Sequence, residues 1–164
     1  MMSSLRASVT STSAPRKCAR ILAIDYGRRH IGLAISDELA LTVSPLPVMQ
    51  RKNRRDDSRR LQKLLGEYQV GLVLVGNPIH LSGRQSDMAE EAARFAERLE
   101  KNLGVKVELL DERLTSWEAE QISRDTRGSI NKKQHVDSMA AAILLREYLD
   151  AARERRAKSS AGGK

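Results

Sequence analysis

The chain has 164 residues and a formal net charge of +8 at pH 7, from 29 Lys and Arg against 21 Asp and Glu. This length suits one domain with a single core, and 3% aromatic residues are too few for a surface that stacks bases. The single cysteine, Cys18, excludes an internal disulfide and a cysteine-rich zinc site. No apolar run approaches the roughly 20 residues of a membrane span. We therefore expect a cytoplasmic protein that does not enter a membrane, and the positive charge favours nucleic acid as its partner.

The two ends of the chain are polar and basic. Residues 1–19 contain Ser, Thr and three positive charges with no acid, which is typical of a disordered extension and also of an organellar transit peptide. Residues 153–164 are predicted to form a disordered basic tail. These boundaries leave 20–152 as the folded domain, and whether the first segment is a targeting signal is left open.

The first part of the domain predicts three antiparallel strands. Arg20–Asp25 is an apolar run that ends on an acid, and Ile31–Ser36 is expected to pair with it across a glycine-containing turn. Leu41–Met49 is a third extended piece. Its Pro45 and Pro47 cannot donate to a ladder, which places this strand at the edge of the sheet.

Helices and strands are predicted to alternate in the rest of the domain. The basic segment Arg51–Arg60, of net charge +4, leads into a helix, and Val70–Val75 follows as a strand covered on both faces. The next helix has its buried stripe from Met88 to Leu103, and Lys106–Asp111 is the next strand. A helix then starts with a capping box at Thr115, and a last helix carries Val136 to Tyr148. This order predicts an α/β fold with a mixed five-stranded sheet and helices on both faces.

Three acids stand where sites form in such sheets, beyond the carboxyl ends of the strands. Asp25 closes the first strand, Glu112 follows the last strand, and Asp137 lies near the start of the final helix. Each acid alone has a structural explanation in a turn, a cap or a helix N-terminus. Three acids at one edge of a sheet favour a cation site, because a buried carboxylate is costly unless it is paired or bound to metal. Mg²⁺ prefers such oxygen ligands, and metal-assisted phosphoryl transfer needs them.

Basic residues lie beside these acids, and the loop Arg124–Lys133 alone carries a net charge of +3. Carboxylates that hold cations next to cations that hold phosphates are the layout of a nuclease, although a basic surface loop explains some of the same residues. Gly76, before Asn77 and Pro78, is expected to leave room between the acids. The candidates for nucleic-acid binding are Arg28, Arg29, His30, Arg113, Arg127 and Lys133.

Four blocks in sequence resemble the YqgF-type, Holliday-junction-resolvase-like family, whose members are also described as pre-16S rRNA nucleases. The blocks are I-D-Y-G-R-R-H-I-G-L-A-I-S-D, V-G-N-P-I-H-L-S-G-R, L-D-E-R-L-T-S-W-E-A-E and H-V-D-S-M-A-A-A-I-L-L-R-E-Y-L, and they span about residues 20–150. The resemblance implies a ribonuclease H-like fold and hydrolysis of nucleic-acid phosphodiesters with Mg²⁺ or Mn²⁺. It implies Asp25, Glu112 and Asp137 as the catalytic and metal-binding acids, and trimming of the 16S rRNA precursor at its 5′ end. His30 and the G-N-P block depart from the family pattern, which leaves the substrate preference open.

Three other functions are weighed against this interpretation. One is a resolvase of branched DNA, and another is a nucleic-acid-binding module of the same fold without catalysis. The block around Asp25 is also similar to the phosphate loop of actin-like ATPases and sugar kinases, but those need two such domains. The partner is expected to be structured RNA, with branched DNA as the alternative, and both a monomer and a homodimer are open.

Overall fold

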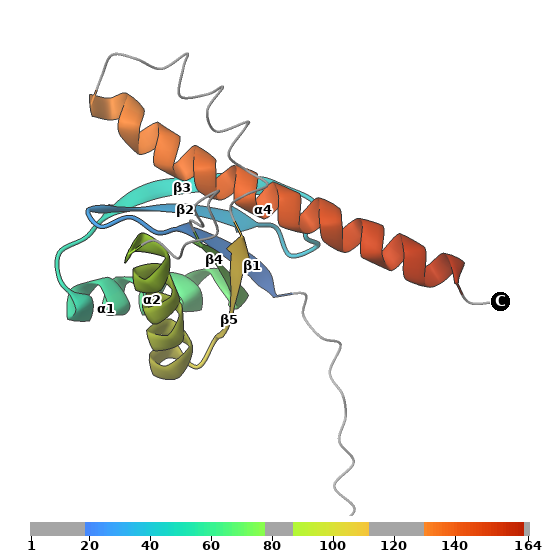
Figure 1. Ribbon diagram of the computed structural model, residues 1–164, viewed down its shortest axis with the longest axis horizontal. Helices are drawn as coiled ribbons and strands as arrows, with labels where there is room; N and C mark the ends of the chain where they lie inside the picture. The colour runs from blue at the N-terminus through green and yellow to red at the C-terminus, as the bar shows by residue number, and fades with distance from the viewer. Residues whose placement is uncertain (1–18, 78–86, 112–129, 163–164) are drawn as a thin grey trace, which may run out of the picture.

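The computed structural model describes residues 19–77, 87–111 and 130–162, with Asp111 and residues 130–137 described by their backbone only. Figure 1 shows a sheet with helices on both faces. The elements are β1 (Arg20–Asp25), β2 (His30–Ser36), β3 (Val43–Gln50), α1 (Arg54–Tyr68), β4 (Val70–Asn77), α2 (Asp87–Leu103), β5 (Lys106–Asp111) and α4 (Ile130–Ala161).

The five strands form one sheet in the order β3-β2-β1-β4-β5. β2 is antiparallel to both β1 and β3, whereas β1, β4 and β5 run parallel to one another. Pro45 and Pro47 lie in the edge strand β3, as predicted. An edge strand has a neighbour on one side only, so it tolerates residues without a backbone N–H. This order and these directions are those of the ribonuclease H-like fold that the resemblance implies, and the predicted mixed sheet is confirmed.

Each face of the sheet has its own apolar core. Leu22, Ile24 and Val73 pack with Phe95 of α2 and Leu61 of α1 on one face. On the opposite face, Ala23, Ala34 and Leu74 pack with Ala141 and Leu145 of α4. Successive residues of a strand point to opposite faces, so the apolar run of β4 supplies both cores and has no polar side.

Helix α1 begins earlier than the sequence analysis expected, inside the basic segment. Asn53 is its N-cap, and the Asn53 side chain accepts a hydrogen bond from the backbone N–H of Asp56. Asp56 and Asp57 lie in the first turn, where the helix dipole favours negative charge. The cap and the acids therefore start the helix within the basic segment that was expected only to lead into it.

Helix α4 is longer at both ends than predicted. It begins at Ile130, so the expected loop Arg124–Lys133 is helical over its last four residues. At the other end it continues to Ala161, which corrects the predicted disordered tail 153–164. Residues 153–161 are exposed, as expected, but Ala, Arg, Glu and Lys are strong helix formers and no Gly or Pro interrupts them before Gly162. Figure 1 shows this end of α4 extending past the sheet.

None of the helices in the described ranges is long and apolar enough to cross a membrane. The predicted helix at Thr115 and the predicted extension 1–18 lie outside the described residues.

Candidate active site

Asp25 ends β1 at the carboxyl edge of the parallel strands. In β1, Ile24 belongs to the core beneath α1 and α2, and Ala23 belongs to the core beneath α4. Because side chains alternate along a strand, Asp25 lies on the face that α4 covers. Its side chain is half-buried, so this carboxylate stands at the margin between the core and solvent.

Glycines flank Asp25 on both neighbouring strands. In the β1–β2 ladder Asp25 pairs with Gly32, and in the β1–β4 ladder Ile24 pairs with Val75, so that Gly76 follows at the level of Asp25. Neither glycine has a Cβ, so neither places a side chain beside the Asp25 carboxylate. Gly32 lies within β2, and the room that Gly76 is expected to leave between the acids stays a prediction.

Helix α4 brings the segment of Asp137 to the same face and level as Asp25. The hydroxyl of Ser138 donates a hydrogen bond of 2.7 Å to the Leu46 carbonyl oxygen in β3. Leu46 pairs with Leu33, and Leu33 pairs with Ile24, so α4 crosses β3 level with the end of β1. β3 lies two strands from β1, which is about 10 Å. Sequence segments separated by more than 100 residues therefore meet at this edge.

The other predicted site residues are described in part or not at all. Glu112, Arg113 and Arg127 lie outside the described residues, and Lys133 is described only as part of the α4 backbone. β5 ends at Asp111, which pairs with Asn77 at the end of β4, so β5 delivers the chain to the same edge just before Glu112. His30 is the first residue of β2, half-buried and paired with Gln50.

Oxygen donors at this edge are of the kind that a hard divalent cation takes. Among the side chains that the structure describes, no group of three His, Cys, Asp or Glu is arranged to hold a metal. Two of the three proposed ligands, however, are not among those side chains. The half-buried Asp25 carboxylate between two glycines fits a cation that prefers oxygen ligands and keeps bound waters.

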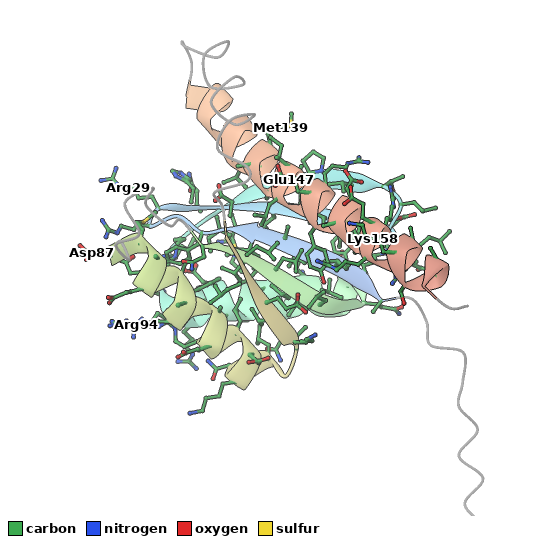
Figure 2. All side chains as sticks on the ribbon, turned by 45° about the vertical axis from the view of Figure 1, so that its right-hand side comes forward. Arg29, Asp87, Arg94, Met139, Glu147 and Lys158 are labelled. Atoms are coloured by element: carbon green, nitrogen blue, oxygen red, sulfur yellow. The ribbon has the colours of Figure 1, made fainter. Side chains whose placement is uncertain are left out.

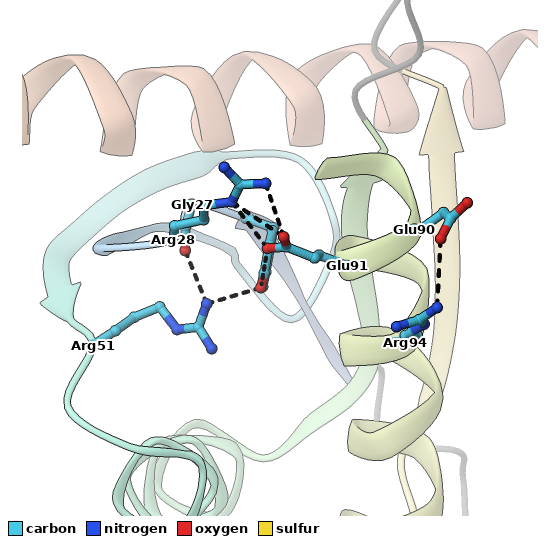
Figure 3. A network of polar contacts seen from close by, with 7 residues as sticks. Gly27, Arg28, Arg51, Glu90, Glu91 and Arg94 are labelled. Atoms are coloured by element: carbon cyan, nitrogen blue, oxygen red, sulfur yellow. Dashed lines mark hydrogen bonds and ion pairs between the residues drawn. The ribbon is translucent and has the colours of Figure 1, made fainter. Parts of the chain in front are cut away.

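The turn after Asp25 is fixed by Arg51, which comes from the end of β3 (Figure 3). Arg51 Nη1 donates to the Tyr26 hydroxyl at 2.8 Å and to the Gly27 carbonyl at 3.2 Å. Its Nε lies 3.3 Å from a carboxylate oxygen of Asp57, which is 3% exposed. A Cβ on Gly27 would clash with the His30 carbonyl oxygen, so the turn closes tightly only with glycine there. Tyr26, which follows Asp25, is thus connected to α1 through Arg51 and Asp57.

Helix α2 holds the same turn through Glu91. Arg28 Nη2 and a Glu91 carboxylate oxygen are 2.9 Å apart, and the Tyr26 hydroxyl lies 3.4 Å from the other oxygen. The hydrogen bond from Arg28 lowers the pKa of Glu91, and the same bond raises the pKa of Arg28. Glu91 therefore compensates the charge of Arg28. Arg29 is exposed at the same end of the molecule (Figure 2).

Two features of this edge were missed from the sequence. Arg51, Asp57 and Glu91 form a support for the turn that no local pattern indicates, because its members come from three separate elements. The second feature is Asn77, whose side-chain oxygen is buried and has no hydrogen-bond partner within the described ranges. The sequence signal for Asn77 is its position directly after Val75 and Gly76, at the end of an apolar strand.

Comparison with known proteins gives close relatives over most of the chain. A protein of Koribacter versatilis named "Putative pre-16S rRNA nuclease" is 40% identical over 132 residues, which is 80% of this chain and 86% of the relative. A protein of Syntrophus aciditrophicus with the same name is 40% identical over 143 residues, covering 87% of this chain and 95% of the relative.

Solved structures of resolvases are more distant. T. thermophilus RuvC in complex with a Holliday junction matches with a TM-score of 0.49 and 16% identity, over 76% of this chain and 90% of that one. The fowlpox virus Holliday junction resolvase matches with a TM-score of 0.48 and 15% identity, over 81% of this chain and 99% of that one.

The sequence model of the family described as "RuvX: Holliday junction resolvase" matches residues 19–151, which is nearly all of the described fold. The chain therefore belongs to the RuvX family.

Proposed function

We propose that this protein is a nuclease that hydrolyses nucleic-acid phosphodiester bonds with Mg²⁺ or Mn²⁺, and that its substrate is the precursor of 16S rRNA. The observation that carries the proposal is the placement of Asp25 at the carboxyl edge, between two glycines and beneath the α4 segment that contains Asp137. The name of the 40%-identical relatives supports the choice of substrate.

The proposal assigns the cation to the carboxylates of Asp25, Glu112 and Asp137. A divalent cation at such a site lowers the pKa of a water nucleophile and offsets charge on the phosphate oxygens. Asp25 is pre-oriented for this role, because Arg51 and Glu91 fix the turn that follows it. Arg29, His30 and the basic residues 113, 127 and 133 are proposed to hold the substrate backbone, with a smaller part for the ion-paired Arg28.

Cleavage of precursor 16S rRNA by the Asp25→Asn variant tests the proposal. Asn keeps the size of the side chain and loses the charge, so we expect at least a ~100-fold loss of rate, the scale of removing one charge-stabilising group from an active site. The matched control is Asp37→Asn, the same substitution in the turn between β2 and β3, at the other end of the sheet. Asp37→Asn should cleave at a rate within ~2-fold of the parent. EDTA should stop cleavage by the parent and by Asp37→Asn.

Calorimetric titration with Mg²⁺ and Mn²⁺ gives a second readout that does not depend on turnover. Asp25→Asn should bind the cation more weakly than the parent, and Asp37→Asn should bind it unchanged. Cleavage by Asp25→Asn at the parent rate would overturn the site assignment. If the parent and Asp37→Asn both fail to cleave precursor RNA with Mg²⁺ and with Mn²⁺, the nuclease assignment itself fails.

Branched DNA is the alternative substrate, and the description of the family as a Holliday junction resolvase favours testing it. Assays on a four-way DNA junction, with the same metal and protein concentration as the RNA assay, separate the two. Faster cleavage of the junction than of precursor RNA would replace the proposed substrate and leave the catalytic acids in place. Tight binding of either nucleic acid without any cleavage would instead support a binding module.

A further inference from the structure

A basic groove runs between α1 and α2, on the face of the sheet opposite α4. It consists of two cavities of about 540 and 520 Å³ that share Arg51, Arg54, Asp57 and Arg98 and therefore adjoin. The walls are the first turns of α1 and one side of α2, and Phe95, Leu99 and Leu103 supply an apolar floor. Of the nucleic-acid-binding candidates whose side chains the structure describes, only Arg28 lines this groove.

The positive charge of the groove is not neutralised by its own acids. Five of its basic side chains have no carboxylate partner among the residues that the structure describes. They are Lys52, Arg54, Arg55, Arg59 and Arg98. Two acids, Asp57 and Glu91, are among the described residues that line the groove, and both are already engaged. Asp57 pairs with Arg51 and accepts the Lys52 backbone N–H, and Glu91 pairs with Arg28. Several uncompensated cations along one groove attract a polyanion.

The groove starts at the edge where Asp25 lies and leads away from it. Tyr26 and Arg28, which follow Asp25 in sequence, line one end, and Asn102 and Leu103 line the other. From Glu91 to Asn102 helix α2 rises about 16 Å, which is long enough for several phosphates of one strand. A single phosphate ion or a mononucleotide would use only part of this length, so an extended strand fits the charge distribution better.

We propose that this groove binds the phosphodiester backbone of a nucleic-acid strand that extends from the scissile site over the sheet edge and between α1 and α2. The proposal rests on the proposed nuclease function, and it adds a second contact surface that is separate from the acids. The guanidinium groups on the rim pair with phosphates, and the apolar floor contacts the sugars. A strand held in this way is bound without regard to base sequence, since the groove reads only the backbone.

Binding of a single-stranded RNA to the full chain, measured by fluorescence anisotropy in EDTA over a range of salt, tests the groove. The triple variant Arg55→Gln/Arg59→Gln/Arg98→Gln removes three charges from it. We expect at least ~10-fold weaker binding and a salt slope smaller by about 2, because each lost phosphate contact on a single strand removes about 0.7 from the slope. The matched control Arg155→Gln/Arg156→Gln/Lys158→Gln removes three charges from the exposed end of α4, and Figure 2 shows Lys158 far from Arg94 of the α2 wall. It should bind within ~3-fold of the parent.

The single variants Arg55→Gln, Arg59→Gln and Arg98→Gln, each expected to weaken binding ~2- to 3-fold, keep the test valid if the triple variant fails to fold. Equal losses in the groove and control triples would mean that net charge alone matters, and this would overturn the groove. An unchanged affinity of the groove triple would overturn it as well. A parent chain that binds no RNA or DNA contradicts the proposed function itself, whereas binding that ignores the groove variants contradicts only this inference.

Discussion

Arg51 is the residue on which the geometry beside Asp25 depends most. Its guanidinium lies 5.0 Å from the ring centroid of Tyr26 and 6.0 Å from that of Phe95, and it donates to the Tyr26 hydroxyl and the Gly27 carbonyl. The ion pair with Asp57 is largely buried, with side-chain exposures of 18% and 4%. Removing one member of such a pair leaves the other charge buried without compensation.

Arg51→Met is therefore expected to lower the free energy of unfolding by about 3 kcal/mol, the usual cost of breaking a buried pair from one side. The double variant Arg51→Met/Asp57→Leu should recover part of this loss, because neither charge is then left alone. Urea denaturation followed by circular dichroism measures both. A double variant less stable than the single variant would show that the uncompensated charge of Asp57 is not the main cost of Arg51→Met.

Asp37 stabilises the turn between β2 and β3 through its charge. One of its carboxylate oxygens accepts the backbone N–H groups of Leu41 at 2.7 Å and Thr42 at 3.0 Å. These hydrogen bonds, that from Thr42 first, hold the pKa of Asp37 below its ordinary value. A carboxyl with a depressed folded-state pKa stabilises the fold above its unfolded value of about 3.9, and this contribution is lost as the pH falls through the folded pKa.

The Asp37→Asn variant should consequently be less stable than the parent at pH 7, and the difference should shrink as the pH falls from 7 through the depressed pKa of the parent carboxyl. Thermal unfolding across that range is the measurement. Glu38→Gln removes one charge from the same turn and controls for net charge. A stability difference that stays constant with pH would show that the Asp37 carboxylate is not the titrating group.

At the scale of the elements, α4 combines a packed half and an exposed half. Ala141, Leu144, Leu145 and Leu149 are buried against the sheet, and residues 153–161 are exposed. Arg153 still reaches back to the Ala40 and Leu41 carbonyl oxygens at 3.2 and 3.1 Å. The packed half provides the helix nucleus, so extending the helix over the basic end costs little.

Two truncations separate these halves. A chain that stops after Arg156 removes residues 157–164, of which the described ones, 157–162, are exposed, and it should keep its melting temperature within about 2 °C. A chain that stops after Tyr148 loses the buried Leu149 and the Arg153 contacts, and it should melt several degrees lower, at roughly 3 °C per kcal/mol for a chain of this size. Equal melting temperatures for the two truncations would mean that the sheet does not depend on the end of the packed half.

At the scale of the whole molecule, two helical layers share one sheet. β4 supplies Val73 and Val75 to the core under α1 and α2, and Leu74 to the core under α4. A layer cannot be lost without exposing one complete face of the same strands. We therefore expect the two cores to unfold together, as in other single domains of this size.

Leu145→Ala in the α4 layer and Phe95→Ala in the α2 layer test this cooperativity. Each should cost about 2–5 kcal/mol, because both side chains are buried in an apolar core. Calorimetry should show one transition for each variant, shifted to lower temperature. The control is Leu39→Ala, whose side chain is 67% exposed and should change stability by less than about 0.5 kcal/mol. Two separate transitions in Leu145→Ala would show that the layers are independent.

Several features of this protein were accessible from the sequence because they depend on neighbours along the chain. Alternation and continuous apolar runs predicted β1, β4 and β5 nearly to the residue, and Pro45 and Pro47 predicted the edge strand. The net charge also misled in two places. The basic segment Arg51–Arg60 was expected only to lead into a helix, and residues 153–164 were expected to be disordered. Charge says little about helix formation where caps and helix-forming residues are present.

The sequence by itself determined the family, the succession of strands and helices along the chain, and the acid that closes β1. Each of these is written in a local pattern or in blocks of residues. The tertiary structure alone decided that Gly32 and Gly76 stand on either side of Asp25, that Arg51, Asp57 and Glu91 support its turn, and that the basic residues of α1 and α2 face one groove. These relations depend on strand register and on helix packing between elements far apart in sequence. No local pattern encodes such distances, because they arise only when the sheet and its two layers are assembled.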